Sequence, residues 1–467
     1  MPGAAHLLLL GAVLLSASAA CGATRIADGL LGFYDLERYR IHRSTDLPSG
    51  GILPLPDPPQ SGGRPILRGA AWRIDAAKAR RPTAEEEGDG ATICEGTRSR
   101  VEADILWPLG RGFRVATAGR LLTGGCGAWE SAWLERNLAW SSSSVEILVG
   151  AARSFWGDGS EGSLLLGRTA PPHEMVRLRS VRPWVLPRTR SLGRFHGSIF
   201  LAYLDDAHRR IPYPLLQGTR LEWEPVSWAR LSASRTILMG GAGRTEKLKG
   251  GDLWDIWWAR DENRRGARDH SDTDQKASFG IEMRLPRMGG APPWLRGARL
   301  FYEYAGEDAF KGPLPTAVAH QMGGAIDLAD WIILGEVAET VDDANYWYTN
   351  HTVYGPGSYY YHGYVMGHPM GPDGVSAHLR IASPSLGGNS LLLWLRGRKH
   401  VDRRSEAGSW WEEGLGCHLG RAIGDNARFE IGVESFRRGS SGAESQDPPI
   451  RWRGSLGVRL GASPRPH

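Results

Sequence analysis

The chain has 467 residues, a formal net charge of +5 and a mean hydropathy of −0.33, with 62 glycines and 19 tryptophans. Four cysteines are too few for a disulfide scaffold, and no run of 18 or more apolar residues predicts a transmembrane helix. Hydropathy averages miss the alternating strands of a membrane β-barrel, however, and the surplus of glycine and tryptophan suits such a barrel. The excess of arginine suits an acidic polysaccharide neighbour or simply a GC-rich genome.

Residues 1–21 are expected to be a secretory signal peptide. An apolar run at residues 7–15 is followed by the small residues 16–20, which is typical of the core and cleavage region of such a signal. Cys21 leaves lipidation open. An exported chain is not expected to bind nucleic acid.

Residues 22–90 are expected to form a periplasmic leader or plug-like segment. Its stretch "DLPSGGILPLPDPPQSGGRP" is rich in proline and glycine and cannot hold regular structure for long. The shorter "YDLERYRIHR" fits two or three helical turns. The following domain is placed at residues 91–467, where strand-like alternation begins.

From about residue 92 the dominant pattern has a period of two residues. In "KASFGIEMRLP", Phe279 and Ile281 share one face, whereas Glu282 and Arg284 share the other. "GRFHGSIFLAYLDD", "RFEIGVESF" and "RWRGSLGVRLGAS" alternate in the same way. Porin-class barrels have roughly 16–18 strands, and about 446 residues divided among about 18 strands leave about 25 for each strand and its connection. We therefore predict an all-β fold, a large antiparallel transmembrane β-barrel in the bacterial outer membrane.

The stretch "YWYTNHTVYGPGSYYYHGYVMGHPMGPDG" at residues 346–374 combines aromatic and turn residues. In a glycan-binding loop, aromatic rings would stack on sugar rings while neighbouring polar groups bond the hydroxyls. A girdle at the membrane interface is the alternative interpretation, and ordinary packing is a third. The candidate glycan-binding residues are Tyr346, Trp347, Tyr348, Tyr359, Tyr360 and Tyr361.

A second candidate for glycan binding is "GGDLWDIWWARDENRRGARDHSDTD" at residues 250–274. Three tryptophans precede a dense block of mixed charge, and as a long loop this segment would grip an acidic polymer. A solvated loop beside a strand-end girdle is the alternative. The candidate residues are Trp254, Trp257, Trp258, Arg264 and Arg265.

No motif in the sequence predicts catalysis or metal binding. The histidines between residues 351 and 378 lack a zinc-ligand spacing, and no segment isolates a pair of carboxylates for glycoside cleavage. Ser163 lacks the spacing of a nucleophile elbow. We expect no enzymatic activity, no catalytic residue, no metal and no cofactor.

Five segments of the central part of the chain form an ordered series: "RSFWGDGSEGSLLLGRTAPP", "RLEWEPVSWARLSASRTILMGGAGR", "DQKASFGIEMRLP", "RLFYEYAGEDAF" and "YHGYVMGHPMGPDG". In content and in order they resemble the Wzi family of capsule-assembly proteins. Together they span about residues 150–380. Residues 22–90 do not match the periplasmic helices that usually precede the barrel in this family, which leaves the architecture of that segment open.

The resemblance implies an outer-membrane barrel of about 18 strands that binds surface polysaccharide. The expected function is that of a lectin-like barrel that anchors or assembles capsular or exopolysaccharide at the cell surface. Outer-membrane lipid and lipopolysaccharide are further expected partners, and so is polysaccharide export machinery. A porin-like channel is the alternative function, with the same strands around an open lumen.

Overall fold

The structure is a computed structural model, and its description covers most of the chain after residue 65. The described residues are 66–78, 83–87, 91–93, 96–124, 130–186, 192–244, 249–258, 272–286, 292–307, 317–329, 331–341, 348, 350–383, 389–400, 409–423, 427–440 and 451–460.

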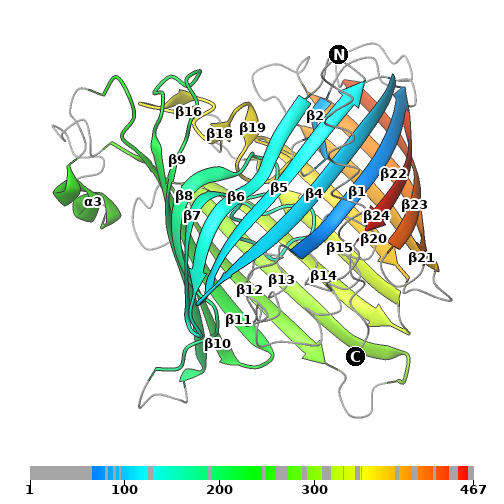
Figure 1. Ribbon diagram of the computed structural model, residues 1–467, viewed down its shortest axis with the longest axis horizontal. Helices are drawn as coiled ribbons and strands as arrows, with labels where there is room; N and C mark the ends of the chain where they lie inside the picture. Colours follow the sequence, from blue (N-terminus) through cyan, green and yellow to red (C-terminus); the bar gives the residue numbers. More distant parts are fainter. Residues whose placement is uncertain are drawn as a thin grey trace.

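Eighteen antiparallel strands form a closed barrel (Figure 1). The first of them, β1, pairs with both β4 and β24, and this closes the sheet on itself. The strands of the wall are β1 (Ile66–Lys78), β4 (Gly96–Gly110), β5 (Phe113–Gly124), β6 (Glu130–Ser141), β7 (Val145–Ala152), β8 (His173–Ser180), β9 (Arg194–Tyr203), β10 (Leu215–Val226), β11 (Ala229–Met239), β12 (Asp274–Pro286), β13 (Leu295–Glu307), β14 (Ala317–Leu328), β15 (Trp331–Glu339), β20 (Gly374–Ala382), β21 (Asn389–His400), β22 (Trp410–Ile423), β23 (Ala427–Ser440) and β24 (Arg451–Leu460).

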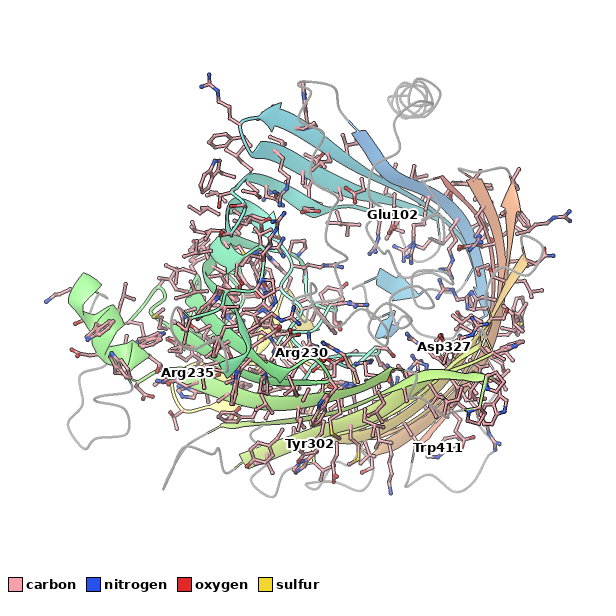
Figure 2. The ribbon with its side chains drawn as sticks, turned by 90° about the horizontal axis from the view of Figure 1, so that it is seen from below. Glu102, Arg230, Arg235, Tyr302, Asp327 and Trp411 are labelled. Carbon is pink, nitrogen blue, oxygen red and sulfur yellow. The ribbon has the colours of Figure 1, made fainter. Side chains whose placement is uncertain are left out.

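The alternation in the sequence becomes an apolar outer face and a charged inner face. On β12, Ile281 is exposed on the outside, whereas Glu282 and Arg284 are buried inside. Figure 2 shows the same division, with Arg230 on the lumen side and Tyr302 on the outer side. This arrangement is the inverse of a soluble core and is the pattern of a barrel in lipid. The predicted all-β membrane barrel is confirmed.

The barrel begins earlier in the chain than predicted. Strand β1 starts at Ile66, inside the segment that was expected to precede the barrel, and residues 83–87 and 91–93 form the short strands β2 (Thr83–Glu87) and β3 (Ala91–Ile93). Glycine and alanines at residues 69–71 and a bulge after Leu67 weaken the alternation of β1, so its sequence does not read as a strand. The predicted signal peptide and residues 22–65 lie outside the described residues.

The connections between strands differ at the two ends of the barrel. Residues 111–112, 142–144 and 227–228 are tight turns at one end, whereas residues 153–172, 240–273 and 340–373 are long connections at the other. Outer-membrane barrels have short periplasmic turns and longer extracellular loops. We therefore assign the end with long connections to the cell exterior.

Smaller elements lie within two of the long connections. Helix α3 (Gly250–Trp257) lies between β11 and β12, and no helix in the described part of the chain is long and apolar enough to cross a membrane. Two short hairpins lie between β15 and β20. Their strands are β16 (Asn350–His351), β17 (Gly355–Pro356), β18 (Tyr360–Tyr361) and β19 (Tyr364–Val365).

Candidate functional site

Two of the long connections fold into the barrel and are called the plug loops below. The first plug loop is residues 153–172, and the second is residues 350–373 together with Tyr348. Leu164 and Met366, one from each loop, are buried in a common cluster with Phe200 and Leu238 of the wall. The plug loops therefore fill the side of the lumen that is lined by β6–β14.

The two plug loops are bonded to each other through their backbones and one tyrosine. The amide of Gly167 donates to the carbonyl of Met366 at 2.6 Å. The hydroxyl of Tyr348 donates to the carbonyl of Leu164 and accepts the amide of His368 at 3.0 Å. Because Tyr348 is fully buried, these bonds replace the ones that water would otherwise make.

Glycine is required where the two plug loops cross. A Cβ atom added to Gly167 would collide with the carbonyl oxygen of Gly367, and one added to Gly367 would collide with the ring of Tyr348. Two backbones can approach this closely only where side chains are absent. The glycines in this part of the sequence therefore serve loop packing as well as turns.

Tyr359 connects the second plug loop to the wall. Its ring stacks on Tyr348 with centroids 5.5 Å apart, and its hydroxyl lies 2.9 Å from the hydroxyl of Thr236 on β11. The ammonium group of Lys276 lies 4.9 Å from the ring centroid, in cation–π contact. Burial raises the pKa of Tyr359, so it stays a neutral hydrogen-bonding group.

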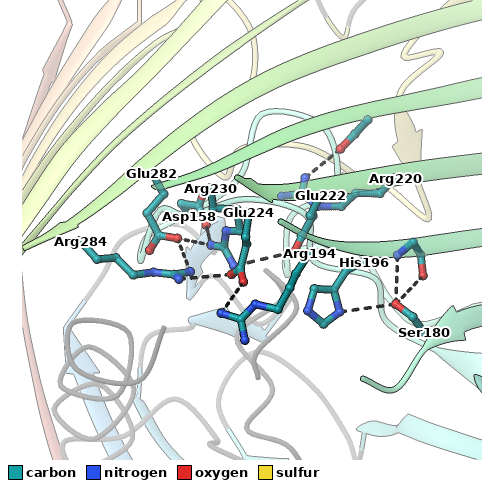
Figure 3. A network of polar contacts seen from close by, with 12 residues as sticks. Asp158, Ser180, Arg194, His196, Arg220, Glu222, Glu224, Arg230, Glu282 and Arg284 are labelled. Carbon is teal, nitrogen blue, oxygen red and sulfur yellow. Dashed lines mark hydrogen bonds and ion pairs between the residues drawn. The ribbon is translucent and has the colours of Figure 1, made fainter. Parts of the chain in front are cut away.

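The first plug loop is held by charged side chains of the inner wall (Figure 3). The carboxylate of Asp158 lies 2.5 Å from the guanidinium of Arg230, which also lies 2.5 Å from Glu282. Arg299, which is fully buried, donates to the backbone carbonyl of Asp158 at 3.0 Å. Removing one partner from such a network leaves a buried charge without its counter-ion, which costs about 3–5 kcal/mol of folding stability.

A second charged cluster surrounds Glu161, three residues further along the first plug loop. Its carboxylate lies 2.5 Å from Arg398 and 3.5 Å from the ring of His378. Burial by itself raises the pKa of Glu161, but Arg398, His378 and Arg396 hold it well below its ordinary value. Glu161 is therefore ionised at neutral pH and fixes the loop to β20 and β21.

The exterior face of the second plug loop carries the hairpin β18–β19. His362 and Gly363 form its two-residue turn, with φ angles of 50° and 81°. Positive φ at both positions defines the type I′ turn, which matches the twist of a hairpin and favours glycine. The turn leaves His362 exposed at its tip.

The connection at residues 204–214, between β9 and β10, clamps this hairpin. The carboxylate of Asp206 accepts the amide of His362 at 3.1 Å, and Arg209 donates to the carbonyls of Ser358 and Tyr360. Burial raises the pKa of Asp206, but amide donors from His208 and His362 leave it below the ordinary value. The carboxylate is therefore charged and holds the turn at neutral pH.

Aromatic and polar groups meet on the exposed side of this assembly, which we call the hairpin surface. It offers aromatic rings for stacking on the C–H face of a sugar. It also offers hydrogen-bond donors and acceptors for the hydroxyls of the sugar. It is made of Asp205, His208, Arg210, Tyr360, His362 and Tyr364, all exposed or partly exposed.

Of these residues, sequence reasoning identified only Tyr360 as a candidate. Asp205, His208 and Arg210 belong to "LDDAHRRIPYP", a polar cluster immediately after a predicted strand. A polar loop in this position could have indicated a binding site. His362 lies in the stretch predicted to bind glycan, where polar groups were expected to bond sugar hydroxyls, but it was not itself a named candidate. The described residues contain no group of three or more side chains suited to hold a metal ion.

The predicted aromatic site residues separate in the structure. Tyr348, Tyr359 and Tyr361 are buried among the plug loops and the wall, so the membrane-girdle interpretation is wrong for them and packing is their observed role. No sugar can stack on these rings while they are covered. Tyr360 lies on the hairpin surface. Tyr346 and Trp347, like Arg264 and Arg265, lie outside the described residues.

The predicted tryptophan site forms a helix instead of the expected loop. Trp254 and Trp257 belong to α3, and Trp258 follows directly. The helix lies outside the ring of strands, whereas the hairpin β18–β19 lies at the top of the barrel (Figure 1). The two groups of candidate residues therefore do not form one site.

A closed 18-stranded barrel with an apolar exterior and charged interior is an outer-membrane β-barrel. The family model of capsule assembly protein Wzi matches residues 79–399, which is more than half of the chain. The chain therefore belongs to the Wzi capsule assembly family, and the resemblance in the sequence is confirmed.

The chain is also similar to two known proteins. A Klebsiella pneumoniae protein described as an uncharacterized 55.8 kDa protein in the cps region is 29% identical over 198 residues, covering 40% of this chain and 36% of that protein. The chain thus matches little more than a third of that relative's length. The structure of Escherichia coli Wzi, described as a carbohydrate-binding β-barrel involved in group 1 capsule assembly, has a TM-score of 0.68. It is 16% identical and covers 95% of this chain and 100% of its own, so the likeness shows a shared fold.

Proposed function

We propose that the protein binds capsular or exopolysaccharide at its exterior face and holds the polymer at the cell surface. The observation that carries this proposal is the hairpin surface, where exposed aromatic and hydrogen-bonding groups lie on the packed plug loops at the exterior end of a Wzi-family barrel. The description of Escherichia coli Wzi as carbohydrate-binding supports the same chemistry.

The mode of binding follows from the shape of the site. The hairpin surface is supported from below by the plug loops and is not a deep cavity, so each sugar repeat meets only a few groups. A repeating polymer compensates for weak single contacts, because each bound repeat raises the effective concentration of the next. We therefore expect avidity for long polymer and weak binding of single repeats.

The plug loops argue against the porin-like alternative. A wide diffusion channel needs an open lumen, whereas here one side of the lumen is packed with buried leucine and tyrosine side chains. The absence of enzymatic activity, the binding of lipopolysaccharide and the contact with export machinery stay predictions.

The direct test measures binding of purified protein to immobilised capsular polysaccharide from the source strain. The double variant His362→Ala/Tyr364→Ala is expected to lose about 5- to 30-fold in affinity, as the loss of about 1–2 kcal/mol would give. Phe113→Ala is the matched control, because Phe113 is an exposed aromatic at the short-turn end of β5. Equal binding by the double variant and the control would contradict the proposal.

A further inference from the structure

Helix α3 lies against the outer face of the barrel, a position that the proposed function does not explain. On β11, Thr236 points inward because its hydroxyl contacts Tyr359 of the second plug loop. Neighbouring residues on a strand point to opposite faces, so Arg235 and Ile237 point outward. Figure 2 shows α3 outside the ring of strands, near the label of Arg235.

One face of α3 is bound firmly to the wall. Ile256 is buried against Ile237. Arg235 donates to the carbonyl of Trp257 at 2.6 Å, and the indole N–H of Trp257 lies 3.5 Å from the hydroxyl of Thr219 on β10. The helix therefore covers polar groups of the outer wall that lipid would leave unsatisfied.

The side of α3 that faces away from the wall exposes apolar side chains, with Asp255 beside them. Trp254 is 58% exposed, Trp258 is 53% exposed and Leu253 is 36% exposed. The rings of Trp254 and Trp257 stack with centroids 6.0 Å apart, and Trp258 meets both edge-on. The two exposed indoles of this cluster carry a large apolar area, and exposed apolar clusters of this kind mark contact surfaces.

The surface next to α3 is the lipid-facing wall. Thr219, which Trp257 contacts, pairs with Ile199 of β9, and Ile199 pairs with Leu178 of β8. Ile199 and Leu178 are exposed on the outer face of the barrel. The apolar face of α3 is thus continuous with the band that contacts membrane lipid.

We propose that α3 is an interfacial helix that inserts Trp254, Trp258 and Leu253 into the outer leaflet, at the boundary between the acyl chains and headgroups of its lipopolysaccharide. Indole rings favour this boundary, where the ring is in hydrocarbon and the N–H reaches polar groups. The position of the helix at the exterior end of β10 and β11 matches the depth of that boundary. The alternative, in which α3 binds polysaccharide, does not fit this position, because the barrel wall separates α3 from the lumen and its plug loops.

Site-specific fluorescence in lipid vesicles tests this assignment. The full chain, with its own cysteines replaced by serine, carries a single Trp254→Cys substitution labelled with a nitrobenzoxadiazole dye. It is reconstituted into vesicles of phospholipid and lipopolysaccharide. A spin-labelled lipid is expected to quench the dye strongly, whereas aqueous iodide is expected to quench it weakly and added polysaccharide to leave it unchanged.

The matched control is His208→Cys in the same background, because His208 is fully exposed on the hairpin surface. Its dye is expected to show the reverse pattern, with strong quenching by iodide. Heat-modifiable migration on gels verifies that both labelled proteins are folded. Strong iodide quenching at position 254 would overturn the proposal, and protection of that position by polymer would assign α3 to glycan binding instead. Either result leaves the test of the hairpin surface unaffected.

Discussion

At the scale of single residues, buried ionisable groups hold the plug loops in place. His368 lies fully buried in the second plug loop, and burial lowers its pKa from 6.5 to about 4. Glu161 is ionised in the first plug loop because its basic partners outweigh the effect of burial. Both groups bind fewer protons in the folded state than in the unfolded state, and this makes the hold on the loops sensitive to acid.

The free energy of unfolding is therefore expected to fall as the pH falls. Between pH 6.5 and about 4 the unfolded state takes up a proton at His368 that the folded state does not, and below about pH 4.5 the same holds for Glu161. Urea titrations in lipid vesicles measure this dependence. His368→Asn should flatten the decline between pH 6.5 and 4. An unchanged slope in this variant would show that His368 does not stay neutral.

At the scale of elements, the hairpin β18–β19 depends on its turn. The φ angle of Gly363 is 81°, and a Cβ added there would meet no atom within 4 Å, so only backbone strain opposes a larger side chain. The turn positions His362 and Tyr364 together, and the clamp from Asp206 fixes its orientation. The geometry of the proposed site is thus set by the hairpin and not by the barrel wall.

Gly363→Val is expected to weaken binding of polysaccharide while leaving the barrel intact. A β-branched residue at positive φ costs about 1–2 kcal/mol or more, which the exposed hairpin can relieve by changing shape. Gly197→Val is the matched control, because Gly197 also has open space but ordinary φ on a wall strand. Polymer affinity and the urea midpoint are measured for both. Equal affinity in the two variants would argue against a role for the hairpin geometry.

At the scale of the whole molecule, the barrel was predictable because lipid imposes period-two alternation over the length of each wall strand. The plug loops were not, because the chemistry that suits tyrosine and glycine to a membrane rim also suits them to a packed lumen. Tyr359, for example, finds its partner Thr236 more than a hundred residues away. Strand β1 was not predicted because its alanines and glycine weaken the alternation of apolar and polar residues. Two of the five segments that carry the family resemblance, "RSFWGDGSEGSLLLGRTAPP" and all but the last glycine of "YHGYVMGHPMGPDG", belong to the two plug loops.

The plug loops predict low conductance. In planar bilayers the natural protein is expected to pass little current, and removal of residues 160–166 is expected to raise it, because this deletes the buried leucines and Glu161. Gel migration before and after heating checks that the shortened barrel still folds. A large conductance in the natural protein would favour the porin-like channel.

The most direct test of capsule attachment compares cell-associated with released polysaccharide in a deletion strain. We expect polymer to move into the medium while total synthesis stays constant, and we expect the natural gene to restore attachment. The variant His362→Ala/Tyr364→Ala should restore it only in part, although it reaches the outer membrane normally. An unchanged partition in the deletion strain would contradict the account.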